Sequence, residues 1–539
     1  MARPSDGFVH LHTHTEYSLL DGMGRVGNVV AAAAADGQQA LAITDHGTLA
    51  GAWKHAHACK AAGIKPILGS ELYLAIGSRF DPQIIQVPGD AADIDGGEEQ
   101  SGTKRKSNQH LTVLAAAPAG WLNLVKISNK AQESFRGRPL ADFDLLAEHG
   151  EGLIVLTGCL GGPVAGPLAR GDDELAEANL LRLMDAVGAE NVYVEIMDHG
   201  IGAETAVLKP LAALADRHCL TMVATNDAHF VHDDDCETHE VWLAAQSKAT
   251  LDDPKRFKFN GTGYHLRTEA EMRTLRPDSL RWQDACTATV AVADRVEDWV
   301  LPESRFRMPR FTLPDGFDDY ESYLHHLVLR GAVQRYGSPL PAEVKQRLRH
   351  ESDVINSLGF GVYFIILHEL VSWARTQGIL VGPGRGSASG SCLAYSLRIT
   401  DVEPLAANLL FERFLEPGRT DMPDIDVDFE QRRIPEIHAH LRDLYGSAFV
   451  ARLGTFAMAR TKRAIKDAAR VYGRNDLGNK MATLVPVSQG RPAGFAELLN
   501  ADFVAGEGFR AVVDADPMAE RILGHARIVE NAVLGAGIH

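Results

Sequence analysis

Three aspartates alternate with apolar residues in one short stretch of this chain, from Pro423 to Phe429. In an extended segment, side chains two positions apart share a face, which predicts a strand with Asp424, Asp426 and Asp428 on one face. Carboxylates crowded in this way repel one another unless a cation lies between them, and Mg²⁺ takes oxygen ligands of this kind. An exposed edge strand whose acids keep it soluble is the alternative. The stretch alone leaves both interpretations open.

A glycine-rich segment precedes the acidic stretch. The sequence predicts a short buried strand at 378–381, a turn over Gly382–Ser391 and the start of a helix at Cys392. In this arrangement, free backbone N–H groups and the positive end of a helix bind phosphate, and glycines let the backbone approach it closely. No Gly-Lys-Ser/Thr follows, so this is not a Walker A loop. Alone, the run indicates a flexible turn equally well; with the downstream arginines and the acidic stretch it predicts a site for a nucleoside triphosphate with metal.

The combined motifs resemble the palm of the C-family replicative DNA polymerases of bacteria, the polymerase III α subunits. The likeness rests on Gly382–Ser391, Leu410–Leu415 and Met422–Phe429, with flanking segments at 359–364 and 454–456. It extends from residue 8 to residue 539 and therefore covers nearly the whole chain. What it implies is DNA synthesis by nucleotidyl transfer to a primer 3′-hydroxyl, with template–primer DNA and deoxynucleoside triphosphates as substrates.

The resemblance also implies residue roles in the palm. Asp424 and Asp426 correspond to catalytic residues that bind two Mg²⁺, and Asp428 to a supporting residue. The implied phosphate-binding residues are Arg385, Gly386, Ser387, Arg413 and Arg419.

A second group of metal-ligand residues lies near the amino terminus. His10, His12 and His14 alternate with apolar or small residues, so a strand would place all three on one face. Further polar groups follow apolar runs, at 44–46, 69–71 and 226–229. A β/α barrel builds its site from side chains at the carboxyl ends of successive strands. The pattern predicts a metal centre in a barrel.

This half resembles the polymerase and histidinol phosphatase (PHP) phosphoesterase domain, which lies at the amino terminus of bacterial α subunits. The resemblance implies a metal centre and a metal-dependent 3′→5′ exonuclease that proofreads the growing strand. His10 is a possible substitute in the first pair. Imidazole, carboxylate and thiolate together suit Zn²⁺ or Mn²⁺ better than Mg²⁺. The implied ligands are His12, His14, Asp21, His46, Glu71, His110, Cys159, Asp227 and His229.

Composition indicates a chain of several domains without a membrane segment. The chain has 539 residues, of which 45% are hydrophobic, and no apolar run reaches membrane-spanning length. Its start lacks the apolar core of a secretion signal. Six scattered cysteines indicate a reducing, cytoplasmic environment.

The net charge of −17 is unfavourable for DNA binding, which needs Lys and Arg to neutralise phosphates. Residues 431–480, however, contain eleven Lys and Arg against four Asp and Glu. Within them, 458–470 is predicted to form a helix with a basic surface, although any one of its cations could be merely solvated. The predicted DNA-binding residues are Arg460, Lys462, Arg463 and Lys466.

The predicted fold is a multidomain α/β protein. Residues 1–290 are predicted to form a PHP domain that is a distorted β/α barrel, with a mobile insertion at 77–108. Residues 291–455 correspond to an α+β palm like that of polymerase β, residues 456–533 to a helical thumb that grips the duplex, and 534–539 to a truncated re-entry into the palm.

In the family, a third palm aspartate, the fingers and the segments that contact the sliding clamp and other replisome subunits follow the point where this sequence stops. We therefore expect the 539 residues alone not to polymerise DNA. Two other functions stay open: a stand-alone phosphoesterase for a small monoester, and a non-catalytic scaffold for DNA or replisome partners. The sequence does not distinguish a main replicase from an error-prone relative.

Overall fold

The computed structural model describes residues 7–88, 99–100, 103–299, 301, 308–419 and 421–538. The chain divides into two compact units. Unit 1 consists of Met1–Leu301 together with Gly454–Ile538, and unit 2 of Pro302–Leu453. Helix α10 (Leu280–Arg295) belongs to unit 1 and runs past the boundary predicted at residue 290.

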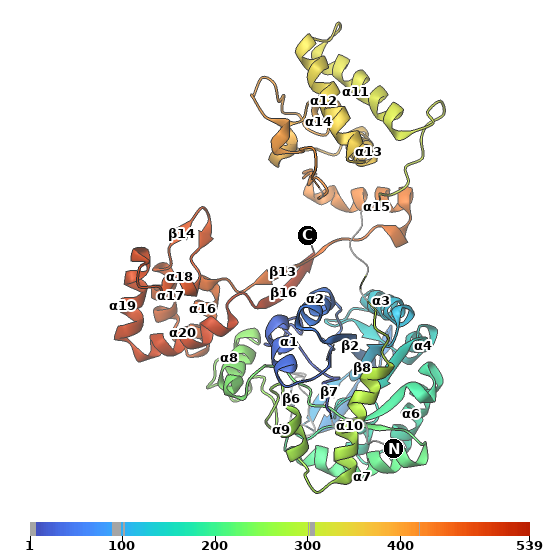
Figure 1. Ribbon diagram of the computed structural model, residues 1–539, viewed down its shortest axis with the longest axis vertical. Helices are drawn as coiled ribbons and strands as arrows, with labels where there is room; N and C mark the ends of the chain where they lie inside the picture. The colour runs from blue at the N-terminus through green and yellow to red at the C-terminus, as the bar shows by residue number, and fades with distance from the viewer. Residues whose placement is uncertain are drawn as a thin grey trace. The chain divides into compact units, whose positions relative to one another are not determined.

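The central feature of unit 1 is a seven-stranded mixed sheet with the order β1-β2-β8-β10-β11-β12, in which β9 pairs with β2 (Figure 1). The pairs β1–β2, β2–β9, β10–β11 and β11–β12 are parallel, whereas β8 is antiparallel to both β2 and β10. The strands are β1 (Ala40–Ile43), β2 (Lys65–Ala75), β8 (Asn108–Ala115), β9 (Leu140–Ala141), β10 (Leu153–Leu156), β11 (Val192–Ile196) and β12 (Met222–Ala224).

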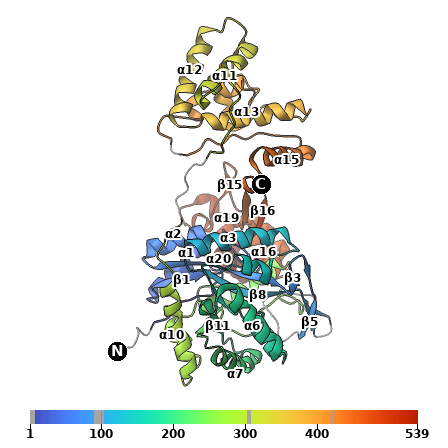
Figure 2. The same ribbon diagram turned by 90° about the vertical axis from the view of Figure 1, so that its right-hand side faces the viewer.

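The strands of this sheet are apolar because both of its faces are covered by other parts of the chain. Val113 and Leu114 are neighbours in β8, so their side chains point to opposite faces, and they enter two different hydrophobic clusters. Figure 2 shows α10 and α6 on opposite sides of the strands. The helices of this part are α1 (Val26–Ala35), α2 (Ala52–Ala62), α3 (Pro118–Glu133), α4 (Phe143–Glu148), α5 (Ala165–Ala169), α6 (Asp173–Val187), α7 (Gly202–Arg217), α8 (Cys236–Gln246) and α9 (Glu269–Thr274).

The segment with the amino-terminal histidines joins the two edges of this sheet. Ala42 N of β1 donates to His10 O at 2.9 Å, and His14 N donates to Ala228 O, just after β12, at 2.7 Å. The predicted strand is wrong, because Thr13 forms only an isolated bridge with Ala228. Its backbone groups are divided between two neighbours, so no continuous ladder forms.

The predicted thumb segment folds onto the sheet unit. Trp242 of α8 shares a hydrophobic cluster with Ile465 and Leu523, and Thr238 Oγ1 lies 3.0 Å from His525 Nδ1. The shared core explains why 454–538 belongs to unit 1 (Figure 1). Its elements are β13 (Gly454–Met458), α16 (Thr461–Val471), α17 (Asn475–Thr483), β14 (Val487–Ser488), β15 (Arg491–Pro492), α18 (Phe495–Leu498), α19 (Glu507–Ala515), α20 (Pro517–Val529) and β16 (Val533–Ile538), which pairs antiparallel with β13.

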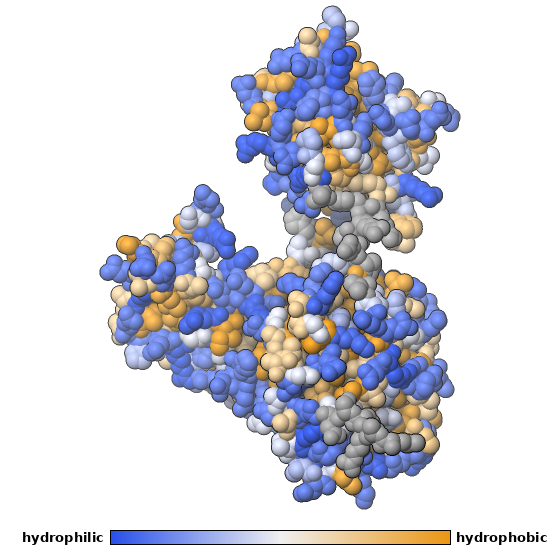
Figure 3. Space-filling model, viewed as in Figure 1, coloured by the Kyte–Doolittle hydropathy of each residue, from blue (hydrophilic) through white to orange (hydrophobic). Residues whose placement is uncertain are grey.

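Unit 2 is helical. Its core lies between α11 (Tyr320–Tyr336), α12 (Ala342–Ser357), α13 (Gly361–Thr376) and α14 (Cys392–Ser396). On the face that Figure 3 shows, hydrophilic residues predominate on unit 2, with hydrophobic residues between them. One more helix, α15 (Ile434–Tyr445), follows the acidic stretch.

Both strands predicted around the glycine-rich turn are wrong. Among the described residues of unit 2, the extended backbone pairs only at one isolated antiparallel bridge, Val381 to Phe429. Two hydrogen bonds flank this bridge, from Gly382 N to Asp428 O at 2.8 Å and from Glu430 N to Leu380 O at 3.0 Å. Leu380, predicted to be buried, is 73% exposed.

The insertion predicted at 77–108 lies partly outside the described residues. Its described part contains β3 (Gly77–Ser78), β4 (Asp81–Pro82), β5 (Ile85–Pro88), β6 (Glu99–Gln100) and β7 (Thr103–Lys106). Elsewhere, no single helix in the described ranges is long and apolar enough to cross a membrane; α12 and α13 meet that test only as a pair, bent by 112° at their junction.

Candidate metal centre and nucleotide site

Buried imidazoles and carboxylates from distant parts of the chain meet at the end of the unit 1 sheet where its parallel strands finish. His46 follows β1, Asp227 follows β12, and Glu71 lies within β2. His110 is near the start of β8. Because β8 is antiparallel to its neighbours, its start lies at the same end of the sheet as the carboxyl ends of the parallel strands. The sheet therefore brings together residues as far apart in sequence as His46 and Asp227.

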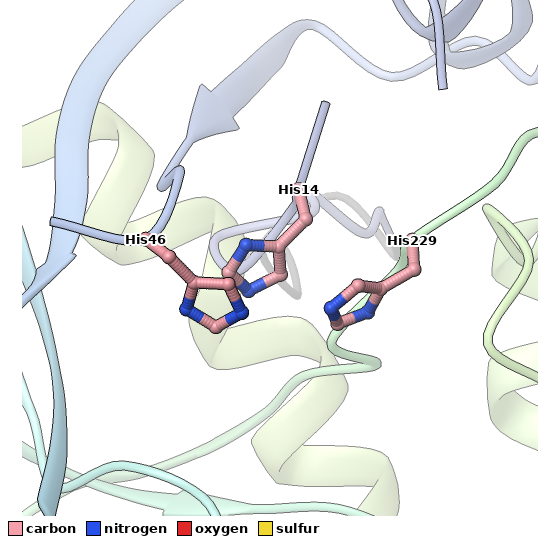
Figure 4. A group of neighbouring side chains, drawn as sticks. All are labelled: His14, His46 and His229. Atoms are coloured by element: carbon pink, nitrogen blue, oxygen red, sulfur yellow. The ribbon is translucent and has the colours of Figure 1, made fainter. Parts of the chain in front are cut away.

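His14 lies at the middle of this cluster. Its Nε2 atom is 3.0 Å from Asp227 Oδ1 and 3.3 Å from Glu71 Oε2. The Nε2 atom of His12 is 3.1 Å from the same nitrogen. Figure 4 shows the rings of His14, His46 and His229 approaching one another from three separate segments, and His14 is stacked on His229 with ring centroids 4.3 Å apart.

Glu71 connects the cluster to its other side. Its Oε2 is 2.7 Å from His46 Nδ1, and its Oε1 is 3.0 Å from His110 Nδ1. Asp21 Oδ2 lies 3.4 Å from His46 Nε2, and Asp21 Oδ1 lies 3.9 Å from His229 Nε2. Eight of the nine predicted ligands thus lie within one connected, buried cluster.

Several buried atoms in this cluster make no hydrogen bond of acceptable geometry, although some of them lie close to an imidazole nitrogen. They include both Asp21 oxygens, Glu71 Oε2, Asp227 Oδ1 and His229 Nε2. A buried carboxylate oxygen without a partner is costly, and a bound cation removes that cost. Within the described residues, the triplets His14–His46–His229, His12–His14–Glu71 and His46–Glu71–His110 each have ligand atoms within 4.8 Å of one another. The donor set therefore fits metal ions.

The histidines of the cluster titrate differently, and a metal would have to displace the proton of His12. Burial would lower the pKa of His12, but Glu195, Asp227 and Glu71 outweigh it and raise that pKa well above its usual value. Burial and the neighbouring His14 lower the pKa of His229 to about 3, so its imidazole is neutral, as a ligand must be.

The predicted ligand Cys159 and the possible substitute His10 have different surroundings from the other ligands. Cys159 is half-buried and accepts a hydrogen bond from Gly161 N at 3.4 Å. Burial raises the pKa of its thiol, while the hydrogen bond with His110 acts in the opposite direction. His10 is not in the cluster, because its Nε2 lies 2.7 Å from the carbonyl oxygen of Arg267. The choice of His12 and His14 over His10 agrees with this geometry.

Glu195 of β11 is a site residue that the sequence reasoning missed. It is 1% exposed, and its Oε1 is 2.8 Å from His12 Nδ1, which leaves Nε2 of that ring to face the cluster. Gly158 N and Thr225 Oγ1 also donate to it, at 2.9 and 2.7 Å. A carboxylate at the centre of the apolar strand Val192–Ile196 was the available indication.

We predict that Glu195→Gln weakens metal binding by about 10- to 100-fold, as expected when the partner that orients a metal-binding histidine is lost. Titration of the metal-free protein with Zn²⁺ or Mn²⁺ would measure this loss. Glu133→Gln, at an exposed carboxylate in the last position of α3, is the control and should leave the affinity unchanged. Equal affinities for both variants would contradict the role of Glu195.

In unit 2 the glycine-rich loop lies beside the acidic segment. Gly382 N donates to Asp428 O at 2.8 Å, and Arg385 Nε donates to Asp428 Oδ2 at 2.8 Å. Asp424, Asp426 and Asp428 are exposed, whereas Ile425 between them is buried. The predicted alternation therefore holds although the strand does not form.

The predicted phosphate-binding residues have different surroundings. Gly386, Ser387 and Arg413 are exposed, while Arg419 Nη1 donates to Phe414 O at 2.8 Å. Gly386 has a φ of 59°, which only a glycine adopts easily. The predicted helix start at Cys392 is not free for phosphate, because the buried carboxylate of Glu351 accepts its N–H.

Tyr363 is a second missed residue. Burial raises the pKa of its phenol, as do the carboxylates of Asp424 and Asp426, whereas a hydrogen bond with the backbone of Ile425 lowers it.

The structure separates the four predicted DNA-binding residues. Arg463 and Lys466 line a cavity of about 260 Å³ between α16 and α17, together with Asp467, Arg470, Asn475 and Asn479. Arg460 instead donates to Asn531 Oδ1 at 2.9 Å, and Lys462 does not line the cavity.

Known proteins resemble both units. The family model "PHP domain" matches residues 10–199, and "Bacterial DNA polymerase III alpha NTPase domain" matches residues 322–539. The DNA polymerase III subunit alpha of Mycobacterium tuberculosis (strain H37Rv) is 40% identical over 544 residues, which cover 99% of this chain and 45% of the relative. The chain contains regions that match both family models, and it is similar over nearly its whole length to bacterial DNA polymerase III α subunits.

Two further relatives are similar to this chain to a comparable extent. The α subunit of Thermus aquaticus is 35% identical, with 97% of this chain and 47% of the relative covered. That of Escherichia coli (strain K12) is 35% identical, with 99% and 44% covered. The chain thus spans less than half the length of these curated relatives.

The two family models divide the candidate site residues between them. The PHP match includes His12, Glu71 and Cys159 but ends before Asp227 and His229. The structure nevertheless places Asp227 and His229 in the same cluster, by way of β12. The polymerase match includes the glycine-rich loop and the acidic segment.

Proposed function

We propose that this chain is the amino-terminal part of a template-directed DNA polymerase, which extends a primer 3′ end with deoxynucleoside triphosphates. The observation that most supports this is the pairing of the glycine-rich loop with the acidic segment at Gly382 and Asp428. This pairing joins the loop that contains Gly386 and Ser387 to the segment that contains Asp424 and Asp426. The similarity to DNA polymerase III α subunits over 99% of the chain supports the same reaction.

In this proposal each group of unit 2 has a defined task. Mg²⁺ bound by Asp424 and Asp426 would lower the pKa of the primer hydroxyl and neutralise the triphosphate. The N–H groups of Gly386 and Ser387 and the guanidinium of Arg413 would bind phosphate oxygens. Asp428 would hold Arg385 in place rather than bind metal. Base pairing to the template would select the nucleotide, and the relatives' designation as a subunit leads us to propose a sliding clamp and other replisome subunits as partners.

The unit 1 cluster would act as a 3′→5′ exonuclease on the same primer. Zn²⁺ or Mn²⁺ bound there would supply a hydroxide near neutral pH and stabilise the leaving oxygen of a phosphodiester. Buried carboxylates and imidazoles with free atoms support this proposal. Glu195 would hold His12 in the required tautomer.

A comparison of two substrates tests the proposed exonuclease activity directly. The full chain, supplied with Mn²⁺ or Zn²⁺, would be compared on a labelled primer with a mispaired 3′ end and on p-nitrophenyl phosphate. We expect the mispaired end to be shortened and the monoester to remain. The opposite preference would support a phosphoesterase for small monoesters, and no activity with no bound metal would support a scaffold.

The cavity between α16 and α17 leads to a prediction about DNA binding. Lys466→Gln should weaken binding to primer–template duplex and reduce the slope of log affinity against log salt by about 0.9, the loss of one phosphate contact. Fluorescence anisotropy at several salt concentrations measures both. Lys462→Gln, on the same helix but outside the cavity, is the matched control. If Lys466→Gln kept the slope of the unmodified chain, the cavity would not be part of the DNA-binding surface.

A further inference from the structure

Helix α12 contacts two separate segments of the candidate nucleotide site through one ion pair. Arg347 and Glu351 are one turn apart on this helix, and Arg347 Nε lies 2.7 Å from Glu351 Oε1. The Glu351 side chain is fully buried, and that of Arg347 is 18% exposed. Neither residue lies in the glycine-rich loop or the acidic segment.

Glu351 holds the end of the glycine-rich loop. Its Oε2 accepts hydrogen bonds from Ser391 Oγ at 2.7 Å and from Leu393 N at 2.9 Å, and its Oε1 accepts one from Cys392 N at 2.9 Å. These donors are the unpaired N–H groups at the start of α14 and the side chain that caps it. The carboxylate of another helix therefore fixes the point where the loop ends.

Arg347 holds the same point from the other side and joins it to the arginine segment. Its Nη2 donates to Gly390 O at 2.9 Å and to Leu409 O at 3.1 Å. The two segments are in close contact, since a Cβ atom at Gly390 would lie 2.7 Å from Leu410 O. The chain that follows Leu410 carries Arg413.

We infer that Arg347 and Glu351 are positioning residues for the triphosphate: they fix the Gly386–Ser387 turn and Arg413 at the spacing that lets both reach the same phosphates. The inference rests on the proposed nucleotide site. A buried ion pair adds little net stability compared with apolar residues of the same volume. Its effect here is the fixed geometry of two ligand-binding segments.

The test uses the full chain and the fluorescent probe N-methylanthraniloyl-dATP with Mg²⁺. Glu351→Gln removes the charge and one of the two acceptor oxygens while keeping the length of the side chain. We expect it to lower the probe affinity about tenfold or more, because small displacements of binding groups are costly. Glu343→Gln, at an exposed carboxylate in the first turn of the same helix, should have no effect.

A double variant separates positioning from stability. Arg347→Met with Glu351→Leu replaces the pair by apolar side chains, which commonly preserves stability. Measured at a temperature where circular dichroism shows a folded protein, it should bind the probe as weakly as Glu351→Gln. Full affinity in a folded double variant, or in Glu351→Gln, would overturn the inference. If the unmodified chain did not bind the probe, the proposed nucleotide site itself would be wrong.

Discussion

Replacing Asp227 and His229 by alanine should abolish metal-dependent shortening of a mispaired primer. Asp227 Oδ1 lies 3.0 Å from His14 Nε2 and 3.4 Å from His12 Nε2, and the His229 ring is stacked on His14. The variant therefore loses two groups at the centre of the cluster. The loss should exceed the roughly 10- to 100-fold that follows from removal of a single outer partner. Gel analysis of labelled primers, with metal titrated into each protein, measures the effect.

The chain offers a matched control for this variant. Asp216 and His218 have the same spacing in sequence but lie at the end of α7, where they pair with Arg281 and Glu177. Replacing both by alanine should leave shortening and metal binding intact. Shortening that survived in the Asp227/His229 variant would assign the activity to another part of the protein or to a contaminant.

Replacing either Asp424 or Asp426 by asparagine should reduce Mg²⁺-dependent nucleotide binding by on the order of 100-fold, comparable to the loss of one electrostatic group at an active site. Asparagine keeps the size of each side chain but removes the charge that attracts a hard cation. Both carboxylates are exposed, so the substitutions should leave the fold unchanged. Titration of N-methylanthraniloyl-dATP at fixed Mg²⁺ concentrations measures the change.

Asp428→Asn is the comparison for this pair. Its Oδ2 accepts a hydrogen bond from Arg385, and an asparagine oxygen can still accept that bond. A much smaller loss is therefore expected. Equal losses at all three positions would show that the segment contributes only general negative charge, and the assignment of Asp424 and Asp426 as the metal pair would fail.

The sequence predicted much of the candidate site because local spacing determines which side chains share a face. The alternation of Asp424, Asp426 and Asp428 with buried Ile425 follows from extended backbone alone, and the structure has it. The same local rule cannot predict pairing. The strands predicted at 378–381 and 423–429 were wrong because pairing depends on neighbours, and these two segments form only an isolated bridge between Val381 and Phe429.

The sequence analysis did not identify the residues that hold site residues in position through hydrogen bonds. Glu195 lies 183 positions from His12, and Glu351 lies 40 positions from Ser391. No motif marks either one, and only the folded arrangement of β11 and α12 shows their contacts. The boundary between the units was also hidden, because the 454–538 segment packs on α8 through a core shared by distant parts of the sequence.

The central claim is that the buried cluster of unit 1 binds metal, and elemental analysis tests it most directly. The purified full chain, dialysed against metal-free buffer, should retain at least one Zn or Mn ion per molecule, and the Asp227/His229 double alanine variant should lose it. A chain that is folded and nearly metal-free, and that gains no thermal stability when Zn²⁺ or Mn²⁺ is added, would contradict the account.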